Sequence, residues 1–228
     1  MEEILIRHYQ RGDRSLLRKI AWDTAFIGEP ADTFFNDREI LADFLTRYYT
    51  DYEPGSCFVA QNPEGRVVGY LTGAKDTGVL ERAFQAKILP GLLRRTLLSK
   101  AFLKKKTLAF IFHFSVSFLR GEFKMPDFRS EYPATLHINI EEKSRHLKIG
   151  SRLIAAYLDY LTGEKIPGVS MATMSGEAGD FFIRQGFSLL YKGNRSYFRY
   201  LLQKDIPIYI YGKKLKAASL PKNPRTNL

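Results

Sequence analysis

Five residues near the middle of the chain could bind an anion. Arg145, Lys148 and Ser151 lie in a polar turn between a β-rich apolar run and a long helical pattern. A strand that enters a helix through such a turn directs backbone N–H groups, here those of Ile149, Gly150 and Ser151, at the helix N-terminus, which carries about half a positive charge. Arg145 suits a two-point phosphate contact, Lys148 adds a cation, and Gly150 lets the backbone approach closely. The turn therefore predicts an anion site; the alternative is an amphipathic helix with a solvated basic first turn.

The hydrophobic pattern predicts the elements that position this turn. Strands are expected over residues 4–9, 56–60, 67–73, 134–140, 169–174, 188–191 and 197–202. Helices are expected after Asp13, over the apolar stripe of residues 40–49, from the turn to about residue 162 with Gly163 as its C-terminal cap, and over 175–185. This mixture of hairpins and strand-helix-strand crossovers predicts an α+β fold with a mostly antiparallel central sheet flanked by helices.

A basic segment interrupts this order. Residues 78–125 are rich in Leu, Phe, Lys and Arg, and Pro90-Gly91 divides two expected helices. The apolar run of residues 108–119 is shorter than the roughly 18 residues that a membrane span needs. We interpret the segment as a helical insertion before the fourth strand of a single domain, residues 1–205. A basic, partly disordered extension is expected over 206–228.

The positive charge is concentrated in two places. The net charge of the 228 residues is +11. Residues 84–120 carry eight Lys and Arg and no acidic residue, and residues 206–228 carry five more, again without acids. The two segments together carry +13, which leaves −2 for the rest of the chain, so the basic segments suit an anionic partner. The single cysteine, Cys57, cannot form an internal disulfide, and the N-terminus has no apolar signal region; both favour a cytoplasmic protein.

Two motifs carry a resemblance to a known family. Residues 145–150, Arg-His-Leu-Lys-Ile-Gly, resemble the Q/R-x-x-G-x-G/A turn of the GNAT-type N-acetyltransferases, with Lys148 at the first Gly. Residues 175–187 resemble the family's N-x-x-A-x-x-F-Y-x-x-x-G-F, with Ser175 for Asn and Phe182 for Tyr. Both motifs occur in the family's order and spacing. Residues 132–138 also look like bacterial GNAT proteins related to the acetyltransferase-like domain of some O-GlcNAc hydrolases.

The resemblance implies a GNAT-like fold and a cofactor, acetyl-CoA. The pyrophosphate of coenzyme A would bind at the turn, and the backbone of the strand's second half would contact the pantetheine arm. The implied cofactor-binding residues are Ile138, Ile140, Arg145, Lys148, Ile149, Gly150, Ser151, Ser175 and Phe181. The implied reaction is direct transfer of an acetyl group to a primary amine of a small or anionic acceptor. The alternative is a non-catalytic acyl-CoA-binding module that acts through its basic insertion.

Acetyl transfer to an amine needs a neutral amine, a donor for the developing oxyanion and a proton for the leaving thiolate. His137 has a suitable intrinsic pKa for a base, directly or through water; a hydrogen-bonded sheet histidine is the alternative. Phe182 cannot supply the proton that a Tyr supplies in many relatives, so Tyr191, Tyr197 and water are candidates. Three further residues are candidates for acceptor binding: Glu29, Asp32 and Tyr132. Glu29 and Asp32 are also alternatives to His137 as the base. The remaining possibility is that both are ordinary solvated carboxylates on a loop.

The insertion has several possible roles. It could cover the acceptor site and select an anionic acceptor. It could lie on an anionic membrane surface. Nucleic-acid binding is disfavoured because no recognised motif accompanies the charge. The remaining options are a homodimer contact and plain packing with Lys and Arg side chains directed outward. We favour packing combined with acceptor selection.

Overall fold

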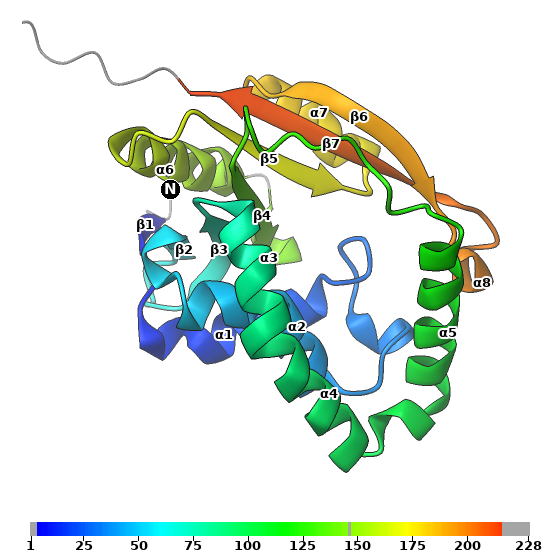
Figure 1. Cartoon of the computed structure of the whole chain (residues 1–228). Coiled ribbons are helices and arrows are strands. Elements are labelled where there is room, and N and C mark those ends of the chain that lie inside the picture. Colours follow the sequence, from blue (N-terminus) through cyan, green and yellow to red (C-terminus); the bar gives the residue numbers. More distant parts are fainter. Residues whose placement is uncertain (1–3, 146, 216–228) are drawn as a thin grey trace, which may run out of the picture.

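The computed structural model describes residues 4–145 and 147–215, which form a seven-stranded mixed sheet (Figure 1). The sheet order is β1-β2-β3-β4-β5-β7-β6, and every neighbouring pair is antiparallel except β4 and β5. The strands are β1 (Leu5–His8), β2 (Cys57–Gln61), β3 (Val67–Ala74), β4 (Ala134–Ile140), β5 (Gly168–Thr173), β6 (Ser188–Arg195) and β7 (Ile206–Lys214). The predicted α+β class with a mostly antiparallel sheet is confirmed.

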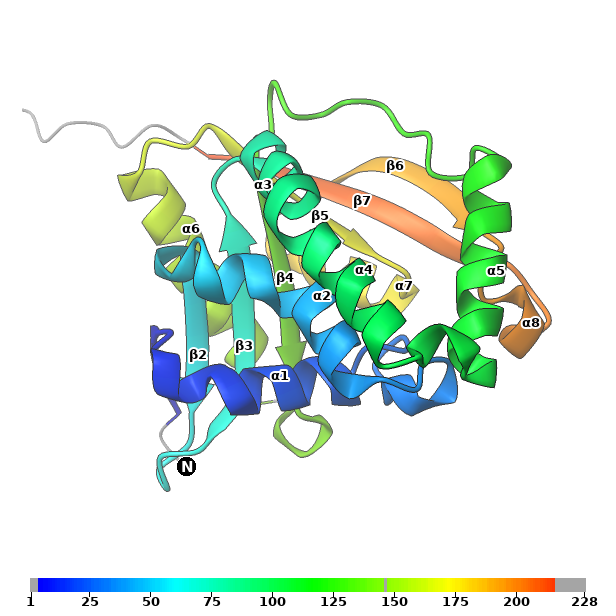
Figure 2. The same cartoon turned by 60° about the horizontal axis from the view of Figure 1, so that its bottom comes forward.

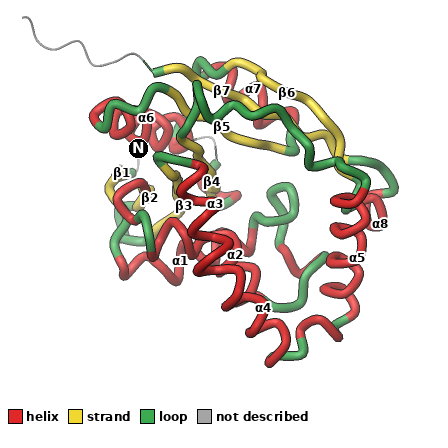
Figure 3. The backbone as a smooth tube through the Cα atoms, viewed as in Figure 1, coloured by secondary structure: helices red, strands yellow, loops and turns green. Residues whose placement is uncertain are grey.

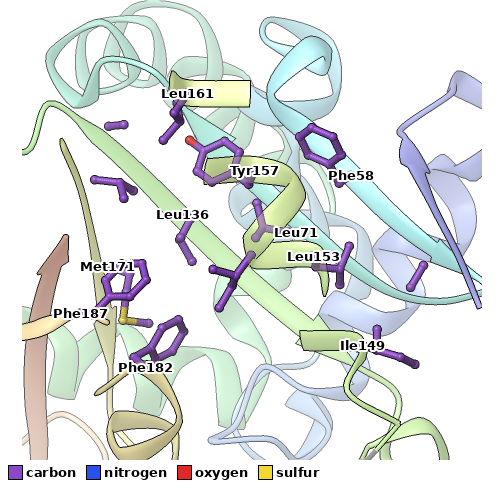
Figure 4. Packing of buried hydrophobic residues seen from close by; sticks show 14 of the residues in the cluster. Phe58, Leu71, Leu136, Ile149, Leu153, Tyr157, Leu161, Met171, Phe182 and Phe187 are labelled. Carbon is purple, nitrogen blue, oxygen red and sulfur yellow. The ribbon is translucent and has the colours of Figure 1, made fainter. Parts of the chain in front are cut away.

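Helices cover both faces of the sheet (Figure 2). On one face lie α1 (Arg14–Asp23) and α2 (Arg38–Asp51), which pack on the β2–β3 hairpin around Val59 and Tyr70. On the other lie α6 (Ile149–Gly163) and α7 (Gly176–Arg184). Side chains at helical spacing on α6, including Ile149, Leu153, Tyr157 and Leu161, are buried against β2, β3 and β4, as Figure 4 shows.

Tyr157 fixes α6 to the sheet at one place. Its hydroxyl donates to the Thr135 carbonyl at 2.8 Å and to the Ala74 carbonyl at 3.3 Å. Its ring occupies the space above Gly73, where a Cβ would lie 2.2 Å from the ring. A side chain at position 73 would therefore displace the ring, so this glycine is required by close approach and not by an unusual backbone angle.

The insertion forms a helical arm along one side of the molecule (Figure 3). It consists of α3 (Thr77–Ala83), a π-helical segment (Phe84–Ile88), α4 (Leu89–Leu98), a 3₁₀ turn (Ala101–Leu103) and α5 (Lys105–Leu119). The π-helical segment ends at Ile88 and α4 begins at Leu89, within one residue of the predicted division at Pro90-Gly91; Pro90 lies in the first turn of α4, where a missing N–H leaves no hydrogen bond unmade. A loop then returns from α5 to β4 across β5 and β7. No helix within the described residues is long and apolar enough to cross a membrane.

The C-terminal part differs from the prediction. Residues 197–202 were expected as a strand, but the segment Arg199–Leu202 is the short helix α8. The partner of β6 is β7, which also pairs with β5, so it is an internal strand of the sheet. The predicted boundary at residues 205/206 is therefore wrong: β7 buries Ile210 and Tyr211 and belongs to the domain. The disorder expected near the C-terminus falls on residues 216–228, which lie outside the described residues.

Candidate functional site

The parallel strands β4 and β5 separate soon after they meet (Figure 2). Only Ala134 with Val169 and Thr135 with Ser170 are paired, although both strands continue for several residues. On its other edge β4 pairs with β3 as far as Ile140. The Glu141 amide donates to the Val68 carbonyl at 2.9 Å, and hydrogen-bonding direction alternates along an antiparallel strand. The backbone groups of Ile138 and Ile140 therefore face the gap between β4 and β5, and their contact with a pantetheine arm stays a prediction.

The open end of this gap leads to the N-terminus of α6. The first α-helical bond there runs from the Arg152 amide to the Lys148 carbonyl at 3.2 Å, and among the described residues no side chain caps the helix. The amides of Ile149, Gly150 and Ser151 thus have no partner within α6, and the first turn has no acidic residue. Lys148, at the position of the motif's first Gly, adopts the left-handed conformation with φ 56° and ψ 15°. Glycine adopts this conformation without steric cost, and here a lysine adopts it.

Three of the predicted cofactor-binding residues meet at the first turn of α6. A Cβ on Gly150 would lie 2.9 Å from Cζ of Phe181 and 3.5 Å from Cδ1 of Ile140. Gly150 is therefore needed for packing of α6 on α7, in addition to any approach of a phosphate. The Ile149 side chain is buried in the core, which leaves only its amide available to a ligand. Ser175 caps α7 by accepting from the Ala178 amide at 3.3 Å.

Arg145 connects the turn to the α1–α2 loop. Its Nη2 donates to the Gly28 carbonyl at 3.2 Å. Glu29, the next residue, is exposed and bonds through its backbone to Phe26. Asp32 is also exposed, and its carbonyl accepts from Lys106 Nζ at 2.5 Å. Both predicted acceptor-binding carboxylates thus lie on an exposed loop, held between the α6 turn and α5.

His137 lies on the β4 face that carries Thr135 and Asn139, opposite the face covered by α6. Its Nε2 is 3.0 Å from Asn139 Nδ2, which also donates to the Tyr70 hydroxyl at 2.8 Å. With Asn139 in this orientation, Nε2 accepts and Nδ1 carries the proton. The residue is exposed, but the protein atoms packed around the ring desolvate it and lower the pKa of His137, which favours the neutral form. The amide occupies the lone pair that a general base would use.

The two candidate tyrosines are placed differently. The Tyr197 hydroxyl is 3.2 Å from Sδ of Met174, the residue that follows β5 by one position. Burial, partly opposed by Arg195, raises the pKa of Tyr197 to about 12. Tyr191 lies on β6, and two strands separate β6 from β4, which places the backbones about 14 Å apart or more. The structure therefore does not bring Tyr191 to His137.

A pocket of about 300 Å³ opens beside the paired ends of β4 and β5, on the face opposite α6. Thr135 and Ser170 form its floor, and the loop after α5 forms its wall. Tyr132, the third predicted acceptor-binding residue, lines this pocket and is largely buried. Glu29 and Asp32 do not line it.

Sequence reasoning missed the charged lining of this pocket. Arg129 donates to Asp127 through Nε and Nη2 at 2.8 and 2.7 Å, and its Nη1 is 3.0 Å from Glu81. The Asp127-x-Arg129 spacing after Pro126 was a local signal for the first pair. Nothing local indicated that Glu81, on α3, lies beside them.

Comparisons with known proteins identify the fold. No protein-family model matches the sequence, and no curated protein sequence matches it. Solved structures match over nearly the whole chain. The protein SsHAT is 20% identical with a TM-score of 0.67, covering 94% of this chain and 99% of its own. A Drosophila melanogaster polyamine N-acetyltransferase is 17% identical with a TM-score of 0.57, covering 93% of this chain and 100% of its own.

A third match carries the superfamily name and a bound cofactor. It is a GNAT superfamily phosphinothricin acetyltransferase from Sinorhizobium meliloti in complex with acetyl-CoA, 12% identical with a TM-score of 0.57, covering 97% of this chain and 94% of its own. The chain has the GNAT fold. The GNAT-like fold predicted from the two motifs is confirmed, with the insertion between β3 and β4. The narrower resemblance to proteins related to O-GlcNAc hydrolases stays a prediction.

Proposed function

We propose that this protein is an acetyltransferase that binds acetyl-CoA between β4 and β5 and acetylates an amine. The observation that carries the proposal is the proximity of two sets of free backbone groups: those of Ile138 and Ile140, which do not pair with β5, and the amides at the N-terminus of α6, where Gly150 lies beside Ile140. The amide groups of a pantetheine arm can hydrogen-bond to the backbone of Ile138 and Ile140. A pyrophosphate suits the helix N-terminus. The Sinorhizobium meliloti protein of the same fold was solved with acetyl-CoA.

The residues around the gap have different roles in binding the cofactor and the acceptor. The amides of Ile149, Gly150 and Ser151 bind the pyrophosphate, with Arg145 and Lys148 as flanking cations. Bound acetyl-CoA supplies the thioester carbonyl that the amine attacks. The acceptor enters from the face that carries His137 and the pocket lined by Tyr132. Neutral His137 accepts the proton of the amine at Nε2, directly or through water, once the Asn139 amide has moved away from that nitrogen.

Tyr197 is the better of the two candidate acids. It retains its proton at neutral pH, and its hydroxyl lies next to the C-terminal end of β5, where the gap is open. Tyr191 is too far from the gap to serve. Phe182 is 2% exposed within the core beside Met171 and Phe187, so α7 presents no hydroxyl at that position (Figure 4).

The buried Phe182 also favours the second candidate function, a non-catalytic acyl-CoA-binding module. Both candidates require cofactor binding, so binding is tested first. At a concentration of about 100 times Kd, acetyl-CoA stabilises the folded state by about 2.7 kcal/mol. For a chain of this length, that raises Tm by roughly 5–10 °C.

The variant Ser151→Glu tests the site, because it places a carboxylate among the free amides without the Phe181 clash of a Gly150 substitution. The matched control is Gly163→Glu at the other end of α6, where a Cβ meets nothing within 4 Å. We expect the acetyl-CoA shift to disappear in Ser151→Glu and to persist in Gly163→Glu. The cofactor proposal is wrong if wild type shows no shift with any acyl-CoA.

Release of free thiol from acetyl-CoA then separates the two functions. The assay uses amino sugars, amino acids, polyamines and peptide N-termini as acceptors. Acceptor-dependent release identifies an enzyme, and Tyr197→Phe should slow it without weakening acetyl-CoA binding. Binding without release over the whole panel supports the module.

A further inference from the structure

The outward side of α5 is unusually apolar. Leu108, Ile111, Phe112, Ser115, Phe118 and Leu119 recur at helical spacing, and we call them the α5 outer face. All except Ser115 are large apolar residues, and all are exposed, from 40% for Ile111 to 83% for Leu119. Single exposed apolar side chains are ordinary, but a continuous row of five along one helix indicates an interaction surface.

The opposite side of α5 accounts for its attachment to the domain. Phe110 packs on Phe198, and His113 stacks on Tyr200 with ring centroids 4.4 Å apart. Glu122 turns inward and accepts from the Ser196 amide at 2.7 Å. These contacts fix which side faces out, and Figures 1 and 2 both show α5 at the margin of the molecule.

Cations flank the α5 outer face. Lys104 precedes α5, Lys105 and Lys106 lie in its first turn, and Arg120 and Lys124 follow its last turn. The Lys106 Nζ donates to the Asp32 carbonyl and the Arg120 Nη1 to the Ser196 hydroxyl, so these two cations contact the domain. Residues 84–120 contain no acidic residue. Of their eight cations, Arg95 is the one that comes within 4.0 Å of a carboxylate in the described part of the chain, that of Asp43. The surface is therefore both apolar and positively charged.

The apolar row and the positive charge together indicate which kind of partner fits the α5 outer face. A second copy would bring two segments of charge +8 together, which like-charge repulsion opposes. A nucleic acid would use the cations and leave the apolar row without a partner. The surface of an anionic membrane uses both, because its phosphates attract the cations while the apolar row enters the headgroup boundary. At 15 residues, about 22 Å, α5 can lie in that boundary but cannot cross the bilayer.

We propose that the α5 outer face and the lysines at its N-terminal end bind the protein peripherally to membranes that contain anionic phospholipid. The proposal is independent of acetyl transfer, since it uses no residue of the β4–β5 gap. Among the roles that the composition of the insertion allowed, the exposed position of the α5 outer face favours contact with a membrane surface.

The test is co-sedimentation of the full chain with vesicles of phosphatidylcholine, with and without phosphatidylserine. We expect binding only when phosphatidylserine is present, and weaker binding at high salt. The double variant Phe112→Gln/Leu119→Gln should bind about tenfold more weakly or worse. Its matched control, Ile183→Gln/Leu189→Gln, changes two apolar residues on α7 and β6 that are also at least half exposed, and it should bind as wild type.

A second variant tests the charge. Lys100→Gln/Lys104→Gln/Lys105→Gln should bind about 100-fold more weakly, since each cation near an anionic surface contributes roughly fivefold. The control variant Lys165→Gln/Lys192→Gln/Lys204→Gln removes the same charge from other parts of the surface. Its affinity for the vesicles should fall far less. All these side chains are exposed, so unchanged Tm values will show that the variants fold.

Three results would overturn the proposal. The first is no binding to phosphatidylserine vesicles. The second is a wild-type dimer in solution that Phe112→Gln/Leu119→Gln converts to a monomer. The third is binding to vesicles or to duplex DNA that depends on the lysines but is unchanged in Phe112→Gln/Leu119→Gln.

Discussion

Replacing Lys148 with Gly should change stability and cofactor affinity in opposite directions. Lys148 is left-handed, with φ 56°, and that conformation costs a residue with a Cβ about 1–2 kcal/mol. Glycine adopts it freely, but its more flexible unfolded chain offsets about 0.5–1 kcal/mol of the gain. We therefore expect Lys148→Gly to stabilise the protein by about 0.5–1 kcal/mol and to raise Tm by roughly 2 °C.

The same change removes a cation from the proposed pyrophosphate site. Lys148 is exposed, so its contact with a phosphate is worth about 1 kcal/mol, and the Kd for coenzyme A should rise about fivefold. Lys165 provides a matched control, because it is an exposed lysine with φ 60° just after the C-terminal end of α6. Lys165→Gly should raise Tm by a similar amount and leave the Kd unchanged.

The measurements are thermal unfolding without ligand and titration calorimetry with coenzyme A. A fall in Tm for Lys148→Gly, together with a rise for Lys165→Gly, would mean that the Lys148 side chain stabilises the turn by more than its backbone strain. Equal Kd values for wild type and both variants would refute the placement of Lys148 beside a cofactor phosphate.

Two further predictions concern the sheet. Because desolvation lowers the pKa of His137, the folded protein keeps the ring neutral to a pH below the ordinary value of 6.5, whereas the unfolded chain already binds a proton there; stability should therefore fall as pH drops below 6.5. In a pH series of Tm values, His137→Gln should flatten that part of the profile, and a profile unchanged by the substitution would contradict the pKa direction. Gly73→Ala should destabilise by about 1–3 kcal/mol, because its Cβ would lie 2.2 Å from the Tyr157 ring. Gly12→Ala, where a Cβ meets nothing within 4 Å, is the control, and denaturant unfolding that ranks the two variants equally would refute the packing argument.

Local features of the site could be predicted from the sequence. The turn of residues 145–151 and the capped start of α7 at Ser175 depend on contacts within a few residues, so their motifs contain the information. The sequence could not show that Gly150 accommodates the Phe181 ring, since 31 positions separate them. It also placed Tyr191 and Tyr197 together as candidates, whereas the strand order puts Tyr191 two strands from β4 and the Tyr197 hydroxyl contacts Met174, the residue that follows β5.

The largest error of the sequence-based prediction is the missed strand β7, and it also arose because the structure there depends on residues distant in the sequence. The segment Ile206–Lys214 contains Pro207 and two lysines, and alone it resembles a basic tail. It forms a strand because it pairs with β5 on one edge and β6 on the other. No local sequence pattern shows that these partners are available. The sequence by itself determined most of the element types as far as β6 and the capped start of α7, because these depend on short-range periodicity and capping, and the resemblance of its two motifs implied the GNAT-like fold. The tertiary structure alone decided the gap between β4 and β5, the pocket beside Tyr132 and the exposed side of α5, because each depends on which distant segments pack together and which remain without a neighbour.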